Sequence, residues 1–228
     1  MTEIVLASNN KKKIAELQVI LGEALGDKVK VLSLSDIGFT GEIDEYGDTF
    51  EQNSLIKASC PAKLGYIGIA DDSGLCVDTL KGAPGVYSAR YSPEGTDAAN
   101  RKKLLSELDG TVERDRKAAF VCAVSIVLPE NCELTIPEKY QAGAHDAQVA
   151  GVYGNRAAVV RGECLGVILD RERGEAGFGY DSLFFSDDLK QTFAEASERE
   201  KNRVSHRGRA VRGMAAVMAE IMKGNNLC

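Results

Sequence analysis

The sequence has no excess of basic residues. Its 228 residues include 28 Lys and Arg against 34 Asp and Glu, which gives a formal net charge of −6 and a pI near 5.2. Proteins that bind nucleic acid or a membrane surface generally present a basic surface. The composition therefore predicts that neither nucleic acid nor a membrane is a partner.

Long apolar runs and paired cysteines are also missing. The longest apolar run, residues 118–128, is too short and too polar, at Ser125, to cross a bilayer. Positive charge near the start, at residues 11–13, follows a short apolar run, which is the reverse of a signal peptide. The six cysteines form no Cys-x-x-Cys pair, and most lie among apolar residues, as free thiols do. These features predict a soluble, cytoplasmic protein with reduced thiols.

Short apolar runs alternate with amphipathic segments along the chain. Strands are expected at residues 3–8, 29–32, 67–71, 117–128 and 164–169, and in a short segment ending at 184–185. Helices are expected at residues 10–22, 48–65, 96–108 and 205–223. This alternation predicts an α/β fold with a mixed sheet. The length and the uniform composition predict one domain over residues 1–228, with the irregular residues 129–155 as a hairpin or an inserted excursion.

Helix ends carry recognisable signals. Asn9 or Asn10 can cap the first helix, and Gly22 is expected to end it. Thr49 and Gln52 have the spacing of a capping box at the start of the second helix. Pro61 is expected to kink or shorten that helix, because its ring is incompatible with a helix interior.

The first segment with chemistry is ASNNKKK, residues 7–13, where a strand turns directly into a helix. Free N–H groups and the dipole at a helix N-terminus favour an anion. Lys11, Lys12 and Lys13 oppose that dipole, so the segment is typical of a phosphate site or of a solvated first turn. The residues alone leave both readings open. Neither a Rossmann fingerprint nor a P-loop is present.

The second segment is the acidic pair Asp71 and Asp72, which follows the apolar run 67–70. At the end of a strand, adjacent side chains point to opposite faces, so Asp72 can face a cleft while Asp71 braces the turn. A carboxylate in that position suits Mg²⁺ together with substrate phosphate oxygens. An ordinary Asp-Ser-Gly turn explains the pair equally well.

Two later segments add positive charge and aromatic rings. Residues 198–212 carry six basic and two acidic residues, and one of only two histidines. Such a run is usually a solvated face, but in an acidic protein it suits a compact polyanion. Phe178 and Tyr180 lie between or beside glycines, where a ring can stack on a nucleobase or pack in the core. The other histidine, His145, is expected to be structural.

These segments, in this order, resemble the inosine triphosphate pyrophosphatase family. The resemblance covers nearly the whole chain and is carried by SNNKKK, DTFEQNSLIKA, ADDSGLCVDTLKGAPGVYSARYS, FGYDSLFF and EKNRVSHRGRA. It implies a mixed central β-sheet flanked by helices, with two lobes around a cleft. It also implies a Mg²⁺-dependent homodimer that hydrolyses ITP, dITP and XTP to the monophosphate and pyrophosphate, which prevents their incorporation into nucleic acid.

The resemblance also implies roles for individual residues. Asp72 falls on the catalytic acid, which binds Mg²⁺ and activates water, and Glu45 falls on a nearby acid that is a second metal candidate. Residues implied to bind the substrate, most of them at its phosphates, are Ser8, Asn9, Asn10, Lys11, Lys12, Lys13, Lys57 and Ser73. Residues implied to hold the base are Phe178, Gly179, Tyr180, Asp181, Lys201, His206 and Arg207.

The chain departs from the family's pattern in three places. Asn9 replaces a usual glycine, Ser182 replaces a usual proline and is expected to loosen the base pocket, and residues 129–158 form a longer stretch than is typical. Two alternatives therefore stay open: a pyrophosphatase with a shifted base preference, and a nucleotide sensor without turnover. The intact acidic pair and Lys13 argue against the sensor.

Overall fold

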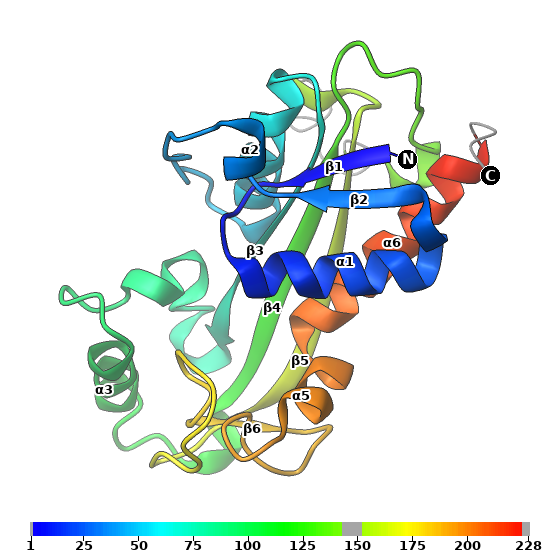
Figure 1. Cartoon of the computed structure of the whole chain (residues 1–228). Coiled ribbons are helices and arrows are strands. Elements are labelled where there is room, and N and C mark those ends of the chain that lie inside the picture. Colours follow the sequence, from blue (N-terminus) through cyan, green and yellow to red (C-terminus); the bar gives the residue numbers. More distant parts are fainter. Residues whose placement is uncertain (1, 143–151, 225–228) are drawn as a thin grey trace. The chain divides into compact units, whose positions relative to one another are not determined.

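The structure is a computed structural model and describes residues 2–142 and 152–224 (Figure 1). Its strands are β1 (Thr2–Leu6), β2 (Val29–Leu32), β3 (Ile67–Val77), β4 (Lys117–Val127), β5 (Ala157–Ile168) and β6 (Phe184–Ser186). Its helices are α1 (Lys11–Leu25), α2 (Phe50–Lys63), α3 (Asp97–Glu107), α5 (Glu198–Val204) and α6 (His206–Gly224). The strands form one sheet in the order β2-β1-β3-β4-β5-β6. Because β1 is parallel to β2 and β3 while β5 is antiparallel to β6, the sheet is mixed, and the predicted fold class is confirmed.

The chain divides into two compact units, which are described separately below. Unit 1 consists of Met1–Asp72, Ala123–Arg161 and Ala210–Cys228, and unit 2 consists of Ser73–Cys122 and Gly162–Arg209. A core cluster in unit 1 contains Leu55, Ala58, Ala62, Ala70, Val127 and Ala157. A core cluster in unit 2 contains Leu75, Leu104, Phe120, Tyr180, Leu183, Phe184 and Phe193, among others. The prediction of one domain over residues 1–228 stays a prediction.

Within unit 1, the backbones of α2 and β3 approach each other closely at Gly68. A Cβ atom added to Gly68 would lie 1.9 Å from the carbonyl oxygen of Ala58 and 2.8 Å from Cγ of Pro61. Real Cβ atoms do not come so near a backbone oxygen, so only glycine fits at this position.

We therefore expect Gly68→Ala to lower the free energy of unfolding by about 3 kcal/mol or more, because the helix must move away from the strand. Gly22→Ala is the matched control, since its added Cβ meets nothing within 4 Å. Gly22 lies inside α1, where alanine should stabilise the protein by about 0.5–1 kcal/mol. Urea unfolding measures both changes, and equal effects of the two substitutions would contradict the close approach.

The first helix begins as predicted and ends later than predicted. Asn10 caps α1, and its Oδ1 accepts hydrogen bonds from the N–H groups of Lys12 (3.0 Å) and Lys13 (3.3 Å). The prediction that Gly22 ends the helix is wrong: the helix continues to Leu25, and Gly26 ends it with φ 65°. A single interior glycine weakens a helix without breaking it, whereas the positive φ at Gly26 is a conformation that glycine adopts easily.

The second helix begins at the predicted cap. Thr49 Oγ1 accepts a hydrogen bond from Gln52 N–H at 3.1 Å. A full capping box would also need the Gln52 side chain to accept a hydrogen bond from the Thr49 N–H. That part of the prediction is wrong, because Gln52 Oε1 accepts from the N–H of Asp48, one residue before the cap, at 2.8 Å. Pro61 lies within the last turn of α2, which ends two residues later at Lys63.

Two predicted strand boundaries are wrong, and one helix was missed. β3 does not end at Asp71 but continues to Val77, and β5 begins at Ala157 rather than Cys164. The helix α5, capped by Ser197, was not predicted at all. By contrast, α6 follows its prediction, and its apolar residues Val211, Met214, Met218 and Ile221 are buried.

The irregular stretch is described only in part. Residues 129–142 contain the 3-10 turn Glu138–Tyr140 and an isolated antiparallel bridge between Gln141 and Ala158, but no strand. Residues 143–151, which include His145, lie outside the described residues.

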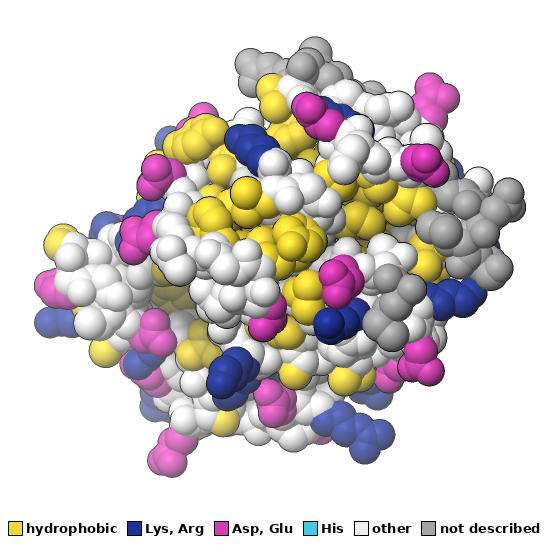
Figure 2. All heavy atoms as spheres, turned by 45° about the horizontal axis from the view of Figure 1, so that its top comes forward, with side chains coloured by type: hydrophobic (Ala, Val, Ile, Leu, Met, Phe, Trp, Pro, Cys, Tyr) yellow, Lys and Arg dark blue, Asp and Glu magenta, His cyan; other side chains and the backbone are white. Residues whose placement is uncertain are grey.

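The remaining predictions concern charge, membranes and thiols. Figure 2 shows one face of the molecule on which basic and acidic side chains are interspersed rather than gathered by sign. None of the helices among residues 2–142 and 152–224 has the length and apolar character needed to cross a membrane. The cysteines at positions 60, 76, 122, 132 and 164 are free thiols, as predicted, and Cys228 lies outside the described residues.

Candidate functional site

The loop between β1 and α1 in unit 1 is held by its own polar side chains. Ser8 Oγ accepts a hydrogen bond from Asn10 N–H at 3.1 Å, and Asn9 Oδ1 accepts one from Ser35 N–H at 2.9 Å. Asn9, which replaces the family's usual glycine, has a negative φ, so this backbone needs no glycine here. The loop therefore keeps an ordered shape with asparagine in place of glycine.

The positive charge beside this loop comes mainly from lysine side chains. The N–H groups of Lys12 and Lys13 already donate to the Asn10 cap, so these two amides are occupied. The side chains of Lys11 and Lys12 are exposed, which suits both a phosphate site and a solvated first turn. An anion at this helix end would meet flexible ammonium groups first.

Lys13 differs from the other two lysines because it forms an ion pair. Its Nζ lies 2.7 Å from Oδ2 of Asp71, whose side chain is only 5% exposed. A carboxylate that is nearly withdrawn from water needs such a partner to stay ionised. Asp71 thus fixes Lys13 next to the loop, which fits the bracing role expected for this acid.

The acids Asp72 and Glu45 share a second lysine. Lys57, from α2, places its Nζ 2.8 Å from Asp72 Oδ1 and 3.1 Å from Glu45 Oε1. The side chains of Asp72 and Lys57 are 11% and 13% exposed. The three predicted residues therefore meet in one cluster within unit 1.

Burial changes the acid–base properties of this cluster. It raises the pKa of Asp72 above its usual value, and the attraction of Lys57 offsets only part of that rise. Burial by itself lowers the pKa of the Lys57 ammonium, but Asp72 and Glu45 outweigh it and raise this pKa. Lys57 therefore stays protonated between the two acids.

The same cluster has the donor chemistry that Mg²⁺ requires. Two carboxylates already converge on one cation, the Lys57 ammonium, and hard divalent ions prefer oxygen ligands. In the part of the chain that the structure describes, no group of three or more His, Cys, Asp or Glu side chains could hold a metal. Asp72 and Glu45 are the two carboxylates of this cluster that could offer oxygen ligands to such an ion.

Asn53 is a member of this cluster that the sequence prediction missed. Its Oδ1 accepts a hydrogen bond from Gly47 N–H at 2.8 Å, and its side-chain amide offsets a small part of the rise that burial causes in the pKa of Asp72. Asn53 is fully buried on α2, one turn before Lys57. Because residues four apart lie on the same side of a helix, the spacing of Asn53 and Lys57 could have indicated in the sequence that Asn53 lies near this cluster.

The turn Phe178–Asp181 in unit 2 brings together several of the residues predicted to hold a base. Asp181 Oδ2 accepts a hydrogen bond from Phe178 N–H at 3.0 Å and pairs with the ammonium of Lys201. The Lys201 Nζ lies 5.0 Å from the centre of the Phe178 ring. Because Phe178 is 77% exposed, its ring is open to stacking.

Tyr180 and His206 are placed differently from Phe178. Tyr180 is 4% exposed and its hydroxyl donates to the carbonyl oxygen of Ser88 at 2.9 Å, so it packs in the core of unit 2 and does not offer a stacking face. The His206 ring stacks on Phe120, with centroids 4.9 Å apart.

The structure also places the two remaining predicted residues, Arg207 and Ser73. Arg207, the next residue on α6, is half-buried. Ser73 is exposed on β3.

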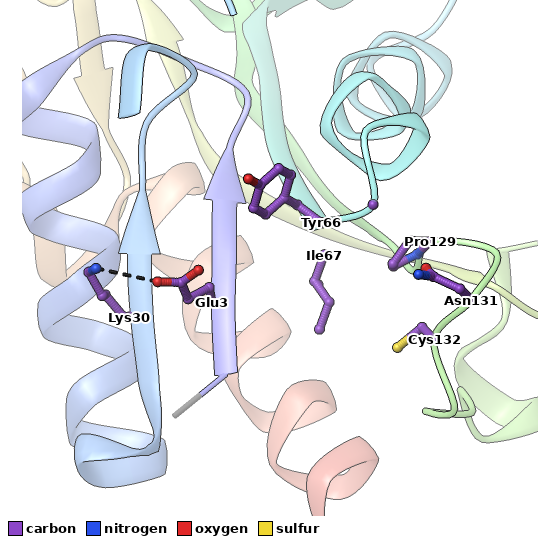
Figure 3. Close-up of a pocket in the computed structure, with 8 residues that line it drawn as sticks. Glu3, Lys30, Tyr66, Ile67, Pro129, Asn131 and Cys132 are labelled. Atoms are coloured by element: carbon purple, nitrogen blue, oxygen red, sulfur yellow. Dashed lines mark hydrogen bonds and ion pairs between the residues drawn. The ribbon is translucent and has the colours of Figure 1, made fainter. Parts of the chain in front are cut away.

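A separate pocket of about 580 Å³ opens in unit 1 at the amino ends of β1, β2 and β3. Figure 3 shows Glu3 and Lys30 on one side of it and Pro129, Asn131 and Cys132 on the other. None of the predicted site residues lines this pocket, and Asp71 and Asp72 lie in the middle of β3, four and five residues after Ile67.

Comparison with known proteins identifies relatives along nearly the entire chain. Residues 4–217 match the family model of the Ham1 family. A dITP/XTP pyrophosphatase of Bacillus licheniformis is 44% identical over 220 residues, which cover 96% of this chain and 98% of the relative. A dITP/XTP pyrophosphatase of Bacillus subtilis is 40% identical over the same length, with the same coverage.

Solved structures give the same result for the fold. A HAM1 protein of Coxiella burnetii matches with a TM-score of 0.79 and 35% identity, covering 96% of this chain and 100% of that one. The Ham1 protein of Staphylococcus aureus matches with a TM-score of 0.78 and 36% identity, covering 95% and 98%.

Proposed function

The chain belongs to the Ham1 family, and on that premise we propose that it hydrolyses non-standard purine nucleoside triphosphates such as dITP and XTP. The products are the nucleoside monophosphate and pyrophosphate. The observation that carries the proposal is the convergence of Asp72, Glu45 and Lys57 in this chain, the two acids and the lysine to which the family resemblance gives catalytic and phosphate-binding roles. Relatives up to 44% identical that are named dITP/XTP pyrophosphatases support it.

In this proposal, unit 1 binds the phosphates and activates water. Lys11, Lys12 and Lys13 attract the triphosphate, whose negative charge they neutralise. Mg²⁺ held by Asp72 and Glu45 would supply a Lewis acid for the phosphate oxygens and lower the pKa of a bound water. Asp72 accepts the proton of the attacking water, whose oxygen bonds to phosphorus while the bond to the pyrophosphate oxygen breaks. Lys57 keeps both carboxylates in place and balances the charge of the leaving group.

Unit 2 recognises the base. The open ring of Phe178 stacks on the purine, and Lys201 and Asp181 supply charged polar groups beside it. Arg207 donates a hydrogen bond to the oxygen at C6 of hypoxanthine or xanthine, a position at which adenine carries an amino group. The names of the relatives favour these substrates over the two alternatives of a shifted base preference and a sensor.

Pyrophosphate release from dITP, XTP, ITP, GTP, dATP and dUTP, with and without Mg²⁺, tests the proposal. We expect fast release from dITP, XTP and ITP only in the presence of Mg²⁺, and rates at least about ten-fold lower with dATP, because one lost hydrogen bond in a buried site costs about that much. Preference for dUTP would overturn the base assignment but not the chemistry at Asp72. Tight binding of dITP without release would support the sensor instead.

We further propose that the enzyme is a homodimer in the cytoplasm. The homodimer is the expected state of the family, and the face in Figure 2 carries hydrophobic side chains gathered near its centre. In the cytoplasm, free nucleotides are incorporated into nucleic acid, and the free thiols of this chain suit a reducing compartment. Light scattering of the purified protein that gives a monomer mass would refute the dimer.

A further inference from the structure

Two charged residues of α3 in unit 2 bind the backbone of the base-recognition turn. Asp97 Oδ2 accepts a hydrogen bond from Gly179 N–H at 2.7 Å, and Arg101 Nη1 donates one to the Gly179 carbonyl oxygen at 2.9 Å. Asp97 and Arg101 are four residues apart, so they lie on the same side of the helix. One helical turn therefore holds both polar backbone groups of a single glycine.

Gly179 is the residue of this turn that most needs support. It has φ 59°, in the left-handed region, and glycine loses more conformational freedom on ordering than any other residue. Its neighbour Phe178 is exposed and gains little from packing. Hydrogen bonds to charged side chains are stronger than neutral ones, so Asp97 and Arg101 can fix a turn that its own side chains leave loose.

Arg101 also forms an ion pair with Glu172, which in turn binds Ser182. Arg101 Nε lies 3.0 Å from Oε2 of Glu172, and the Ser182 hydroxyl donates to the same oxygen at 2.8 Å. Ser182 stands where the family usually has proline, whose ring would stiffen the chain without any partner. The contact through Glu172 opposes the loosening expected from this replacement.

We propose that Asp97 and Arg101 are positioning residues that set the discrimination between bases by fixing Gly179, and with it the ring of Phe178. They touch the backbone of the turn and act on the substrate only through it. The inference rests on the proposed function, because it assumes that the turn Phe178–Asp181 reads the base.

The test compares Asp97→Ala, Asp97→Asn and Arg101→Ala with the wild-type enzyme. In both alanine variants we expect the KM for dITP to rise about ten-fold and the preference for dITP over dATP to fall about ten-fold, with kcat nearly unchanged, because the phosphate residues lie in unit 1. Asp97→Asn keeps an acceptor for the Gly179 N–H without the charge, so it should restore most of the preference. Lys102→Ala, an exposed position on the same helix, is the matched control and should change neither quantity.

The outcomes separate this inference from the proposed function. If the wild-type enzyme hydrolyses dITP and both alanine variants keep its base preference, the inference fails and the function stands. A fall in kcat and in melting temperature without a change of preference would show a purely structural role and also overturn it. If the wild-type protein releases no pyrophosphate, the proposed function fails, and the affinities of the same variants for dITP and dATP then decide the inference by themselves.

Discussion

Asp72→Asn should lower kcat for dITP by about a thousand-fold, since a positioned general base alone contributes roughly 10²–10⁴-fold. Asparagine has nearly the same shape but neither accepts the proton of the attacking water nor carries the charge that holds a divalent ion. The ion pair of Asp72 with Lys57 also disappears, although Lys57 keeps Glu45 at 3.1 Å. Steady-state pyrophosphate release at saturating Mg²⁺ measures the loss.

The stability of this variant shows whether the loss is chemical. Burial raises the pKa of Asp72 in the folded protein. At pH values above that pKa, the ionised carboxylate therefore lowers the free energy of unfolding, and this penalty disappears as the pH falls. Removing the charge at neutral pH therefore should not lower the melting temperature by much.

Asp44→Asn is the matched control for Asp72→Asn, because it removes an exposed carboxylate next to Glu45 and should leave kcat unchanged. A folded Asp72→Asn protein with normal turnover would refute the role of this acid.

The phosphate side of the site was predictable in part from local sequence. The cap at Asn10 and the exposed Lys11 and Lys12 depend on residues only a few positions apart, and local rules describe such contacts well. The pairing of Lys57 with Glu45 and Asp72 joins positions 12 and 15 residues away. Only the family resemblance suggested these partners, because no periodicity relates a loop, a helix and a strand.

The acidic pair shows how a correct site can follow from a wrong boundary. Asp71 was expected to end its strand, yet β3 continues to Val77. The pairing of β1 with β3 stops at Leu6 and Ile69, two residues before the acids. The acids thus lie just beyond the end of the neighbouring parallel strand, where such sheets bind ligands, although their own strand does not end there. Alternation of polar and apolar residues shows where one strand lies, but not where its neighbour stops.

The base side was harder to predict because its supports are backbone atoms. Ser197 and Glu200 form a capping box that marks α5 in the sequence, but the surrounding charges made residues 198–212 look like one solvated run. Nothing in the sequence indicates that Asp97 and Arg101 meet the N–H and carbonyl groups of Gly179. Backbone groups are the same at every residue, so composition and spacing carry no trace of such contacts.

Arg207→Met should reduce the preference for dITP over dATP by roughly ten- to a hundred-fold, the value of a hydrogen bond in a buried site that is built to receive it. The guanidinium only donates hydrogen bonds. It can therefore pair with the oxygen at C6 of hypoxanthine, while the amino group of adenine would bring a second donor against it. Methionine keeps an unbranched apolar side chain like the stem of arginine but has no such donor, so kcat/KM for dITP should fall while that for dATP stays constant or rises.

Arg209→Met is the matched control for this substitution. Arg209 lies two residues further along α6 and is bound to Asp188 at 2.9 Å and to the Glu163 carbonyl oxygen, so its loss removes one arginine without touching the base. It should leave the preference intact. If Arg207→Met lowers kcat/KM for dITP and dATP by the same factor, Arg207 binds a part that both nucleotides share, such as a phosphate, and the assignment to the base is wrong.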